Sequence, residues 1–126
     1  MTKSLRLLAV LWDMDGVIVD TYEGHFQAWQ QCFAEVGQPY DEEMFRKTFG
    51  MNNRLILTTV FGHELDEEFI QKVSDRKEIL FRDGIRGKVQ TLPGVMNWLE
   101  KFEKMGAKQA VASSAPQANI DALITE

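Results

Sequence analysis

The sequence has few of the features that mark secreted, membrane-spanning or nucleic-acid-binding proteins. Its 126 residues include one cysteine, Cys32, so no internal disulfide can form and a reducing, cytoplasmic setting is expected. The longest apolar run, Leu7 to Trp12, is far shorter than the roughly 20 residues that a membrane span needs. Lys and Arg total 14 against 19 Asp and Glu, and this net charge of −5 argues against nucleic-acid or anionic-membrane partners.

Length and composition nevertheless predict a folded protein. The chain is shorter than a typical domain of about 150 residues, which excludes a multidomain assembly. Apolar residues make up 44% and charged residues 26% of the sequence, close to the averages of globular proteins. Long disordered or collagen-like segments are therefore not expected.

Apolar patterning predicts an α/β fold. The nearly continuous apolar run Leu5 to Trp12 is typical of a strand buried on both faces of a parallel sheet, and Gln109 to Ala112 predicts a second short strand. Helical spacing and capping residues predict helices over 21–36, 41–49, 52–61, 66–81, 91–106 and 116–124.

The first four helices interrupt the connection between the two strands. Residues 1–20 and 89–126 are expected to form part of a parallel core, and residues 21–88 a separate helical bundle. Two parallel strands seldom form a domain by themselves, so we expect the N-terminal portion of a longer protein. Such a chain, taken alone, is expected to expose strand edges and to self-associate.

Two acids directly follow the first strand, in Asp13-Met14-Asp15-Gly16. Open α/β sheets bind their ligands at the carboxyl ends of strands, and residues two apart can point to the same side. Two such carboxylates repel each other unless a hard divalent cation such as Mg²⁺ lies between them. One carboxylate can then attack phosphorus while the other protonates the leaving oxygen. The structural alternative is a solvated turn after the strand.

The surrounding residues, WDMDGVIVDT from Trp12 to Thr21, resemble the first motif of the haloacid dehalogenase (HAD) superfamily, hhhDxDGVhhDT, where h is apolar. The resemblance implies an incomplete Rossmann-like HAD core with an inserted α-helical cap. It implies that Asp13 is the nucleophile and that Asp15 is the general acid and base. It also implies that both residues bind Mg²⁺, Asp13 through its carboxylate and Asp15 through its backbone carbonyl. True dehalogenases lack the second acid, so its presence implies phosphoryl transfer through an aspartyl phosphate.

A second resemblance to the superfamily lies in Val111 to Pro116, VASSAP. It implies that Ser113 donates a hydrogen bond to a phosphate oxygen, with Ser114 as a further phosphate-binding candidate. Read without the resemblance, either serine can cap the following helix, whose free N–H groups suit an anion, and Pro116 suits the first turn of that helix.

The helical insert resembles the cap of the branch that includes sugar-phosphate phosphatases and β-phosphoglucomutase. The match is clearest in residues 20–29, DTYEGHFQAW against DTxExHFxAW of the mutase. It implies that His25 positions the general acid and that Trp29 lines the substrate site. The structural alternative places Phe26 and Trp29 in the bundle core and His25 at its edge.

Two cations of the insert are further candidates. Lys77 lies on an apolar helical stripe, so it either extends along that surface to solvent or faces an anion, and the resemblance implies substrate contact. Residues 50–54, GMNNR, resemble the specificity loop of these caps, but the mutase has an arginine where Asn53 aligns. Arg54 comes one place later. It either reaches a second phosphate of the substrate or is an ordinary arginine at a helix start.

Together these patterns predict Mg²⁺-dependent hydrolysis of a small sugar phosphate. Isomerisation of a sugar phosphate, as in the mutase, and a non-catalytic binding module are the alternatives. The expected partner is a small phosphorylated metabolite, with no nucleic acid and no membrane. The superfamily's phosphate-binding lysine and later acidic pair are expected beyond Ile124.

Overall fold

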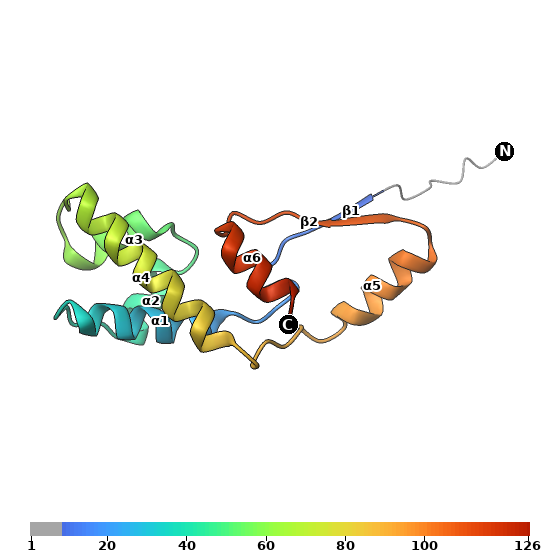
Figure 1. Ribbon diagram of the computed structural model, residues 1–126, viewed down its shortest axis with the longest axis horizontal. Helices are drawn as coiled ribbons and strands as arrows, with labels where there is room; N and C mark the ends of the chain where they lie inside the picture. The colour runs from blue at the N-terminus through green and yellow to red at the C-terminus, as the bar shows by residue number, and fades with distance from the viewer. Residues whose placement is uncertain (1–8) are drawn as a thin grey trace. The chain divides into compact units, whose positions relative to one another are not determined.

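A computed structural model describes residues 9–126, and the chain divides into two compact units. Met1–Tyr22 and Val89–Glu126 make up one, here called the sheet unit, and Glu23–Lys88 make up the other, the helical unit (Figure 1). The first four residues of the predicted first strand, 5–8, lie outside the described residues. None of the helices in residues 9–126 is long and apolar enough to cross a membrane.

The sheet unit is built on two parallel strands, β1 (Ala9–Trp12) and β2 (Lys108–Val111), paired in register from Ala9 opposite Lys108 to Trp12 opposite Val111. Helices α5 (Val95–Lys104) and α6 (Gln117–Ile124) complete it. The Trp12 indole N–H donates to Gln109 Oε1 at 2.9 Å, and Gln109 Nε2 donates to the carbonyl of Leu99 at 3.0 Å. These bonds tie both strands to α5.

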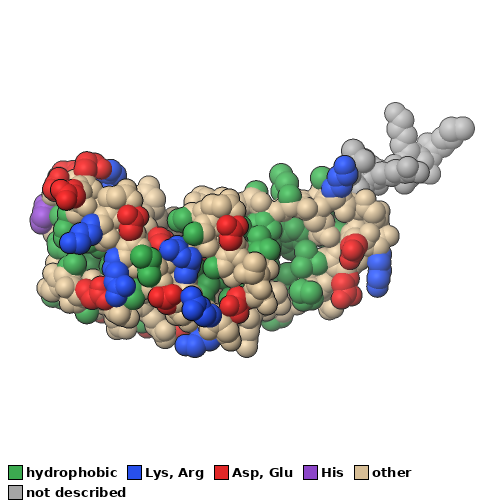
Figure 2. Space-filling view, viewed as in Figure 1, with side chains coloured by type: hydrophobic (Ala, Val, Ile, Leu, Met, Phe, Trp, Pro, Cys, Tyr) green, Lys and Arg blue, Asp and Glu red, His purple; other side chains and the backbone are tan. Residues whose placement is uncertain are grey.

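The prediction that the first strand is buried on both faces is wrong for its described residues. The Leu11 side chain is 73% exposed, and Val111 on β2 is 36% exposed. The sheet formed by the described residues has two strands and no interior strand, so each strand keeps an unpaired edge there. Figure 2 shows hydrophobic side chains reaching the visible surface of this unit.

The helical unit consists of α1 (Tyr22–Glu35), α2 (Glu42–Thr48), α3 (Asn53–Phe61) and α4 (Glu67–Ile85), with α1 beginning at the unit boundary. The predicted helices are all present, and two caps are as expected. Asp41 Oδ1 accepts the N–H of Met44 at 2.8 Å, and Asn52 Oδ1 accepts the N–H of Leu55 at 2.9 Å. These bonds satisfy donors that a helix start leaves unpaired.

Helix α4 ends at Ile85, four residues after the predicted end at Phe81, because Gly84 does not end it. Ile85, the last helical residue, is 8% exposed and packs on Gly24 of α1. A Cβ atom at Gly24 would lie 3.0 Å from Ile85 Cγ2 and 3.2 Å from the Phe81 ring. Burial of Ile85 against this glycine outweighs the weak helix propensity of Gly84.

Aromatic and aliphatic side chains fill the core of the helical unit: Ala28, Trp29, Cys32, Phe33, Phe45, Ile56, Leu57, Val60, Ile70, Val73, Phe81 and Ile85. At its surface, Arg76 of α4 forms two hydrogen bonds with Glu35 of α1, at 2.9 and 2.8 Å. Burial raises the pKa of the Cys32 thiol to about 11, so this cysteine is a core residue and a poor nucleophile at neutral pH.

Candidate active site

The loop that follows β1 is folded into a single tight turn. The carbonyl of Met14 accepts N–H groups from Val17, Ile18 and Val19 at 3.2, 3.0 and 3.3 Å, and Gly16 takes a φ of +74°. That positive φ suits glycine, because other residues meet a steric cost there. The Met14 side chain is 2% exposed and anchors the turn.

This turn is also attached to the segment that precedes α5. Asp20 N–H donates to the Gln90 carbonyl at 3.4 Å, and Leu92 N–H donates to the Ile18 carbonyl at 2.9 Å. Residues 18–20 are therefore held against residues 90–92 within the sheet unit.

Both acids of the motif are oriented by hydrogen bonds. Asp13, an exposed residue, accepts the N–H of Met14 at Oδ1 over 2.9 Å. Asp15 accepts the hydroxyl of Thr21 at Oδ1 over 2.7 Å, and Thr21 is 4% exposed. The sequence contains Thr21 within the motif, but nothing in the spacing indicates that its hydroxyl reaches back six residues to the acid.

Ser113 lies at the same edge of the sheet as Asp13. Trp12 pairs with Val111, and the Ala112 N–H donates to the Trp12 carbonyl at 2.7 Å, which extends the ladder by one bond. Asp13 and Ser113 thus leave neighbouring strands, which lie about 4.8 Å apart, at their carboxyl ends.

The two serines do not cap the following helix. Ser113 Oγ accepts the N–H of Ala115 at 3.1 Å, and Ser114 is exposed. Pro116 occupies the N-cap position of α6, and no side chain of residues 9–126 caps that helix. The predicted serine cap and the predicted place of Pro116 inside the helix are therefore wrong. The Ser113 hydroxyl oxygen instead accepts a hydrogen bond within its own loop, before α6 begins.

The donor set of the acidic motif suits Mg²⁺. The Asp13 carboxylate and the Asp15 backbone carbonyl offer hard oxygen atoms of the kind this ion prefers. Over residues 9–126, no group of three or more His, Cys, Asp or Glu side chains lies close enough together to hold a metal ion. The described residues therefore contribute two candidate ligands.

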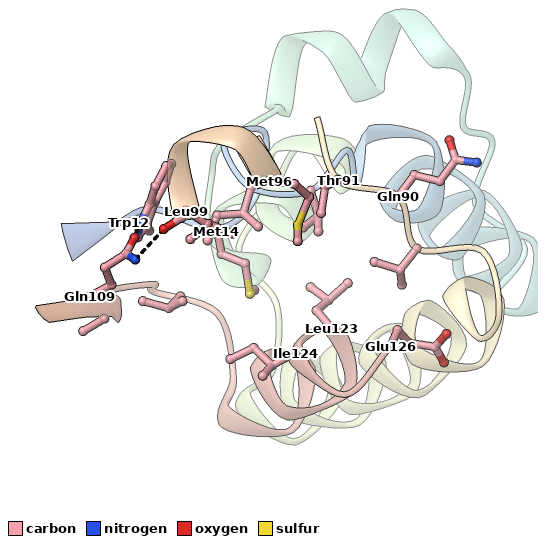
Figure 3. Close-up of a pocket in the computed structure, with 15 residues that line it drawn as sticks. Trp12, Met14, Gln90, Thr91, Met96, Leu99, Gln109, Leu123, Ile124 and Glu126 are labelled. Carbon is pink, nitrogen blue, oxygen red and sulfur yellow. Dashed lines mark hydrogen bonds between the residues drawn. The ribbon is translucent and has the colours of Figure 1, made fainter. Parts of the chain in front are cut away.

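A cavity of about 870 Å³ in the sheet unit is separate from these polar groups. Its lining includes Trp12 and Met14, Leu99 of α5 and Leu123 of α6 (Figure 3). The lining contains neither of the two acids nor Ser113. Its mainly apolar character fits side-chain packing and is unsuited to a phosphate.

The candidate cap residues His25, Trp29 and Lys77 lie together in the helical unit. Lys77 Nζ is 3.0 Å from His25 Nδ1 and 5.3 Å from the centre of the Trp29 ring. The His25 ring stacks on Phe81 with 4.0 Å between ring centres. Trp29 is 1% exposed, so its indole is part of the bundle core as well as a wall of this cluster.

Lys77 faces an anion from its own chain, which decides between the two alternatives for this lysine. Its Nζ donates to Glu78 Oε1 at 3.1 Å, and the side chains of the pair are 4% and 11% exposed. Asn53 Nδ2 donates to the same carboxylate oxygen at 2.8 Å. The sequence gives no sign of this arrangement, because Asn53 and Glu78 belong to different helices.

Arg54 is not part of this cluster. It pairs with Glu67 at the surface, where its side chain is 53% exposed. The pairing raises the pKa of the guanidinium, chiefly through the hydrogen bond to that carboxylate. In the structure, Arg54 is thus an exposed arginine at the start of α3.

Comparison with known proteins gives one family for the chain. Residues 10–126 match the sequence pattern of the haloacid dehalogenase-like hydrolases. The phosphorylated carbohydrates phosphatase of Thermotoga maritima is 30% identical over 113 residues, which cover 86% of this chain and 50% of that protein. The beta-phosphoglucomutase of Bacillus subtilis is 28% identical over 120 residues, which cover 87% of this chain and 52% of that protein.

The fold agrees with this match. The crystal structure of a HAD hydrolase of family IA, variant 3, from Entamoeba histolytica has a TM-score of 0.81 and 23% identity, covering 94% of this chain and 54% of that one. The chain spans about half the length of the curated relatives it matches. It contributes two parallel strands of a Rossmann-like HAD core and an inserted helical bundle. The chain belongs to the haloacid dehalogenase-like hydrolase family.

Proposed function

We propose that this chain supplies the nucleophile, the acid–base group and a phosphate-binding hydroxyl of a phosphatase that acts on a small sugar phosphate. One observation carries the proposal. Asp13 and Asp15 leave β1 at the edge of the sheet where Ser113 leaves the parallel neighbour β2. The similarity to a phosphatase of phosphorylated carbohydrates supports the substrate class.

In this proposal Asp13 attacks phosphorus and forms an aspartyl phosphate, while Asp15 protonates the leaving oxygen. Asp15 then removes a proton from the water that attacks the aspartyl phosphate. Ser113 Oγ accepts the N–H of Ala115, and this bond does not use the hydroxyl proton of Ser113. That proton can be donated to a phosphate oxygen. Thr21 fixes the orientation of the Asp15 carboxyl group through their hydrogen bond.

Mg²⁺ belongs to the same proposal, with the Asp13 carboxylate and the Asp15 carbonyl as its ligands from this chain. When bound, the ion supplies positive charge that offsets the repulsion between the carboxylates and the substrate phosphate.

We assign the sheet unit to the catalytic core and the helical unit to the cap. His25, Trp29 and Lys77 are the proposed contacts for the sugar part of the substrate. Their mutual proximity within the helical unit supports this assignment. The exposed Arg54, paired with Glu67, is a weaker candidate for substrate contact.

A mutase-type isomerisation is the second candidate. The contact of 3.0 Å between Lys77 and His25, two residues that match the mutase pattern, favours it, as does the similarity to a beta-phosphoglucomutase. Asn53 weighs against it, because this residue stands where the mutase has an arginine and its side chain binds Glu78.

The test is a phosphate-release assay of the full-length gene product, with and without Mg²⁺, on acetyl phosphate and a set of sugar phosphates. Asp13→Asn should abolish turnover and phosphoenzyme formation, because an amide of the same shape cannot attack phosphorus. Asp41→Asn is the matched control, since Asn caps α2 as well as Asp does. Residual activity of Asp13→Asn above about 1% of wild type would contradict the nucleophile role, because losses of nucleophiles are usually far larger.

Conversion of β-glucose 1-phosphate to glucose 6-phosphate without phosphate release would favour the mutase. Absence of both reactions would favour a non-catalytic module.

A further inference from the structure

The ammonium group of Lys77 sits in a nearly closed environment in the helical unit. Its side chain is 4% exposed, and its Nζ lies 5.3 and 5.5 Å from the ring centres of Trp29 and Phe81. Because an ammonium group only donates hydrogen bonds, the contact of 3.0 Å makes His25 Nδ1 the acceptor. His25 and Asn53 are only partly buried and form the accessible polar edge of the cluster.

Glu78 balances this charge. Its carboxylate oxygen accepts from Lys77 Nζ at 3.1 Å and from Asn53 Nδ2 at 2.8 Å. Glu78 is the next residue along α4, and neighbouring helical residues do not ordinarily face each other. The bond from Asn53 of α3 holds the carboxylate in the position that meets the ammonium.

A lysine that is paired with a carboxylate in this way binds a phosphate dianion poorly. A second phosphate would have to compete with a carboxylate already bound to the ammonium, and it would meet repulsion from that carboxylate in a poorly solvated site. Neutral hydroxyl groups escape this repulsion, because they can hydrogen-bond to the edge of the cluster without adding charge.

We propose that Glu78 is a specificity-determining residue, which makes the helical unit select uncharged, hydroxyl-bearing substrate groups and reject a second phosphate. The inference rests on the proposed phosphatase function and narrows its substrates to monophosphates. Glu78 acts here through Lys77, so it is a positioning residue. Asn53 supports it by fixing the carboxylate.

The experiment compares kcat/KM for fructose 6-phosphate and fructose 1,6-bisphosphate in the full-length gene product, its Glu78→Gln variant and a control. Glu78→Gln removes the negative charge and keeps the shape, so the ratio of bisphosphate to monophosphate kcat/KM should rise about tenfold, the value of one charged hydrogen bond. Glu35→Gln is the matched control, because it removes the carboxylate of an exposed Glu–Arg pair in the same unit. The control should leave the ratio unchanged.

Each outcome has a separate meaning. If wild type hydrolyses acetyl phosphate or fructose 6-phosphate and Glu78→Gln leaves the ratio within twofold of wild type, the specificity inference is overturned and the phosphatase function stands. If wild type hydrolyses neither, the phosphatase function fails and the inference falls with it. A loss of stability alone would not move the ratio, so a merely structural role of Glu78 also predicts no change.

A second variant covers the case in which Glu78→Gln fails to fold. Lys77→Gln combined with Glu78→Gln removes both charges and leaves no unpaired buried ion. If the wild-type lysine is already neutralised, this double variant should keep the wild-type ratio. A tenfold fall in the ratio would show that Lys77 binds the second phosphate in the wild type, and it would overturn the inference.

Discussion

The hydroxyl of Thr21 donates a hydrogen bond of 2.7 Å to Asp15 Oδ1, across the tight turn that separates the two residues. Thr21 is 4% exposed, so the bond lies where water competes poorly for the carboxylate. The residue that closes the acidic motif therefore orients its second acid.

Thr21→Val should lower kcat of the full-length gene product about tenfold to a hundredfold, since it impairs but does not remove the acid–base group. Thr21→Ser keeps the hydroxyl and should retain most activity. The measurement is steady-state phosphate release, with far-ultraviolet circular dichroism to show that both variants are folded. Equal activity of the valine and serine variants would show that the hydrogen bond has no part in turnover.

Asp15→Asn should be impaired more severely, by about 10²- to 10⁴-fold, because the amide cannot exchange a proton with the leaving oxygen or with water. Formation of the phosphoenzyme from acetyl phosphate should persist, since that leaving group needs little protonation. Rapid-quench measurement of the phosphoenzyme separates the two steps. If hydrolysis of acetyl phosphate and of sugar phosphates falls equally and no phosphoenzyme forms, Asp15 has another role.

Local signals in the sequence located the helices well. Asp41 and Asn52 cap helices at the predicted places because a cap depends on residues three positions apart. Helix α4 runs past Gly84 because Ile85 is buried against α1, a tertiary contact that helix propensity does not contain. The exposure of Leu11 likewise depends on how many strands surround β1.

The candidate site was predictable to a different extent in each unit. The motif after β1 and the parallel strand order bring Asp13 and Ser113 to one edge of the sheet, so their proximity follows from sequence. The bonds of Glu78 to Lys77 and Asn53 join residues from two helices, and no spacing rule brings them together. Charge balance within the helical unit could be described only from side-chain positions.

The close approach of α1 and α4 predicts opposite effects for two glycine-to-alanine changes. Gly24→Ala would place a Cβ 3.0 Å from buried Ile85, and overpacking of this kind costs about 1–3 kcal/mol. Gly84→Ala meets nothing within 4 Å, so it should stabilise α4 by about 0.5–1 kcal/mol through helix propensity. Urea unfolding followed by circular dichroism gives both values. A stabilising Gly24→Ala would mean that the two helices separate readily.

The pair of Glu35 and Arg76 predicts a pH dependence of stability. The hydrogen bond from Arg76 lowers the pKa of Glu35 below its ordinary value of 4.5. A lowered folded-state pKa gives stability that is present above the unfolded pKa and is lost as pH falls through the folded one. The difference in unfolding free energy between wild type and Glu35→Gln should therefore be constant near neutral pH and shrink below pH 4.5. Urea unfolding at a series of pH values tests this, and a difference that grows on acidification would contradict it.

The 126-residue chain alone should self-associate through its sheet unit. Within residues 9–126 both strands have an unpaired edge, and the 73% exposed Leu11 lies on β1, a combination that promotes pairing between chains. Leu11→Lys places a charge on β1 and should shift the chain toward monomer, because edge lysines oppose strand addition.

Leu55→Lys is the matched control, since Leu55 is 47% exposed but lies on α3 of the helical unit. Sedimentation velocity over a range of concentrations distinguishes the variants. A wild-type chain that stays monomeric at every concentration, or a control that dissociates the oligomer as well as Leu11→Lys does, would place the association elsewhere.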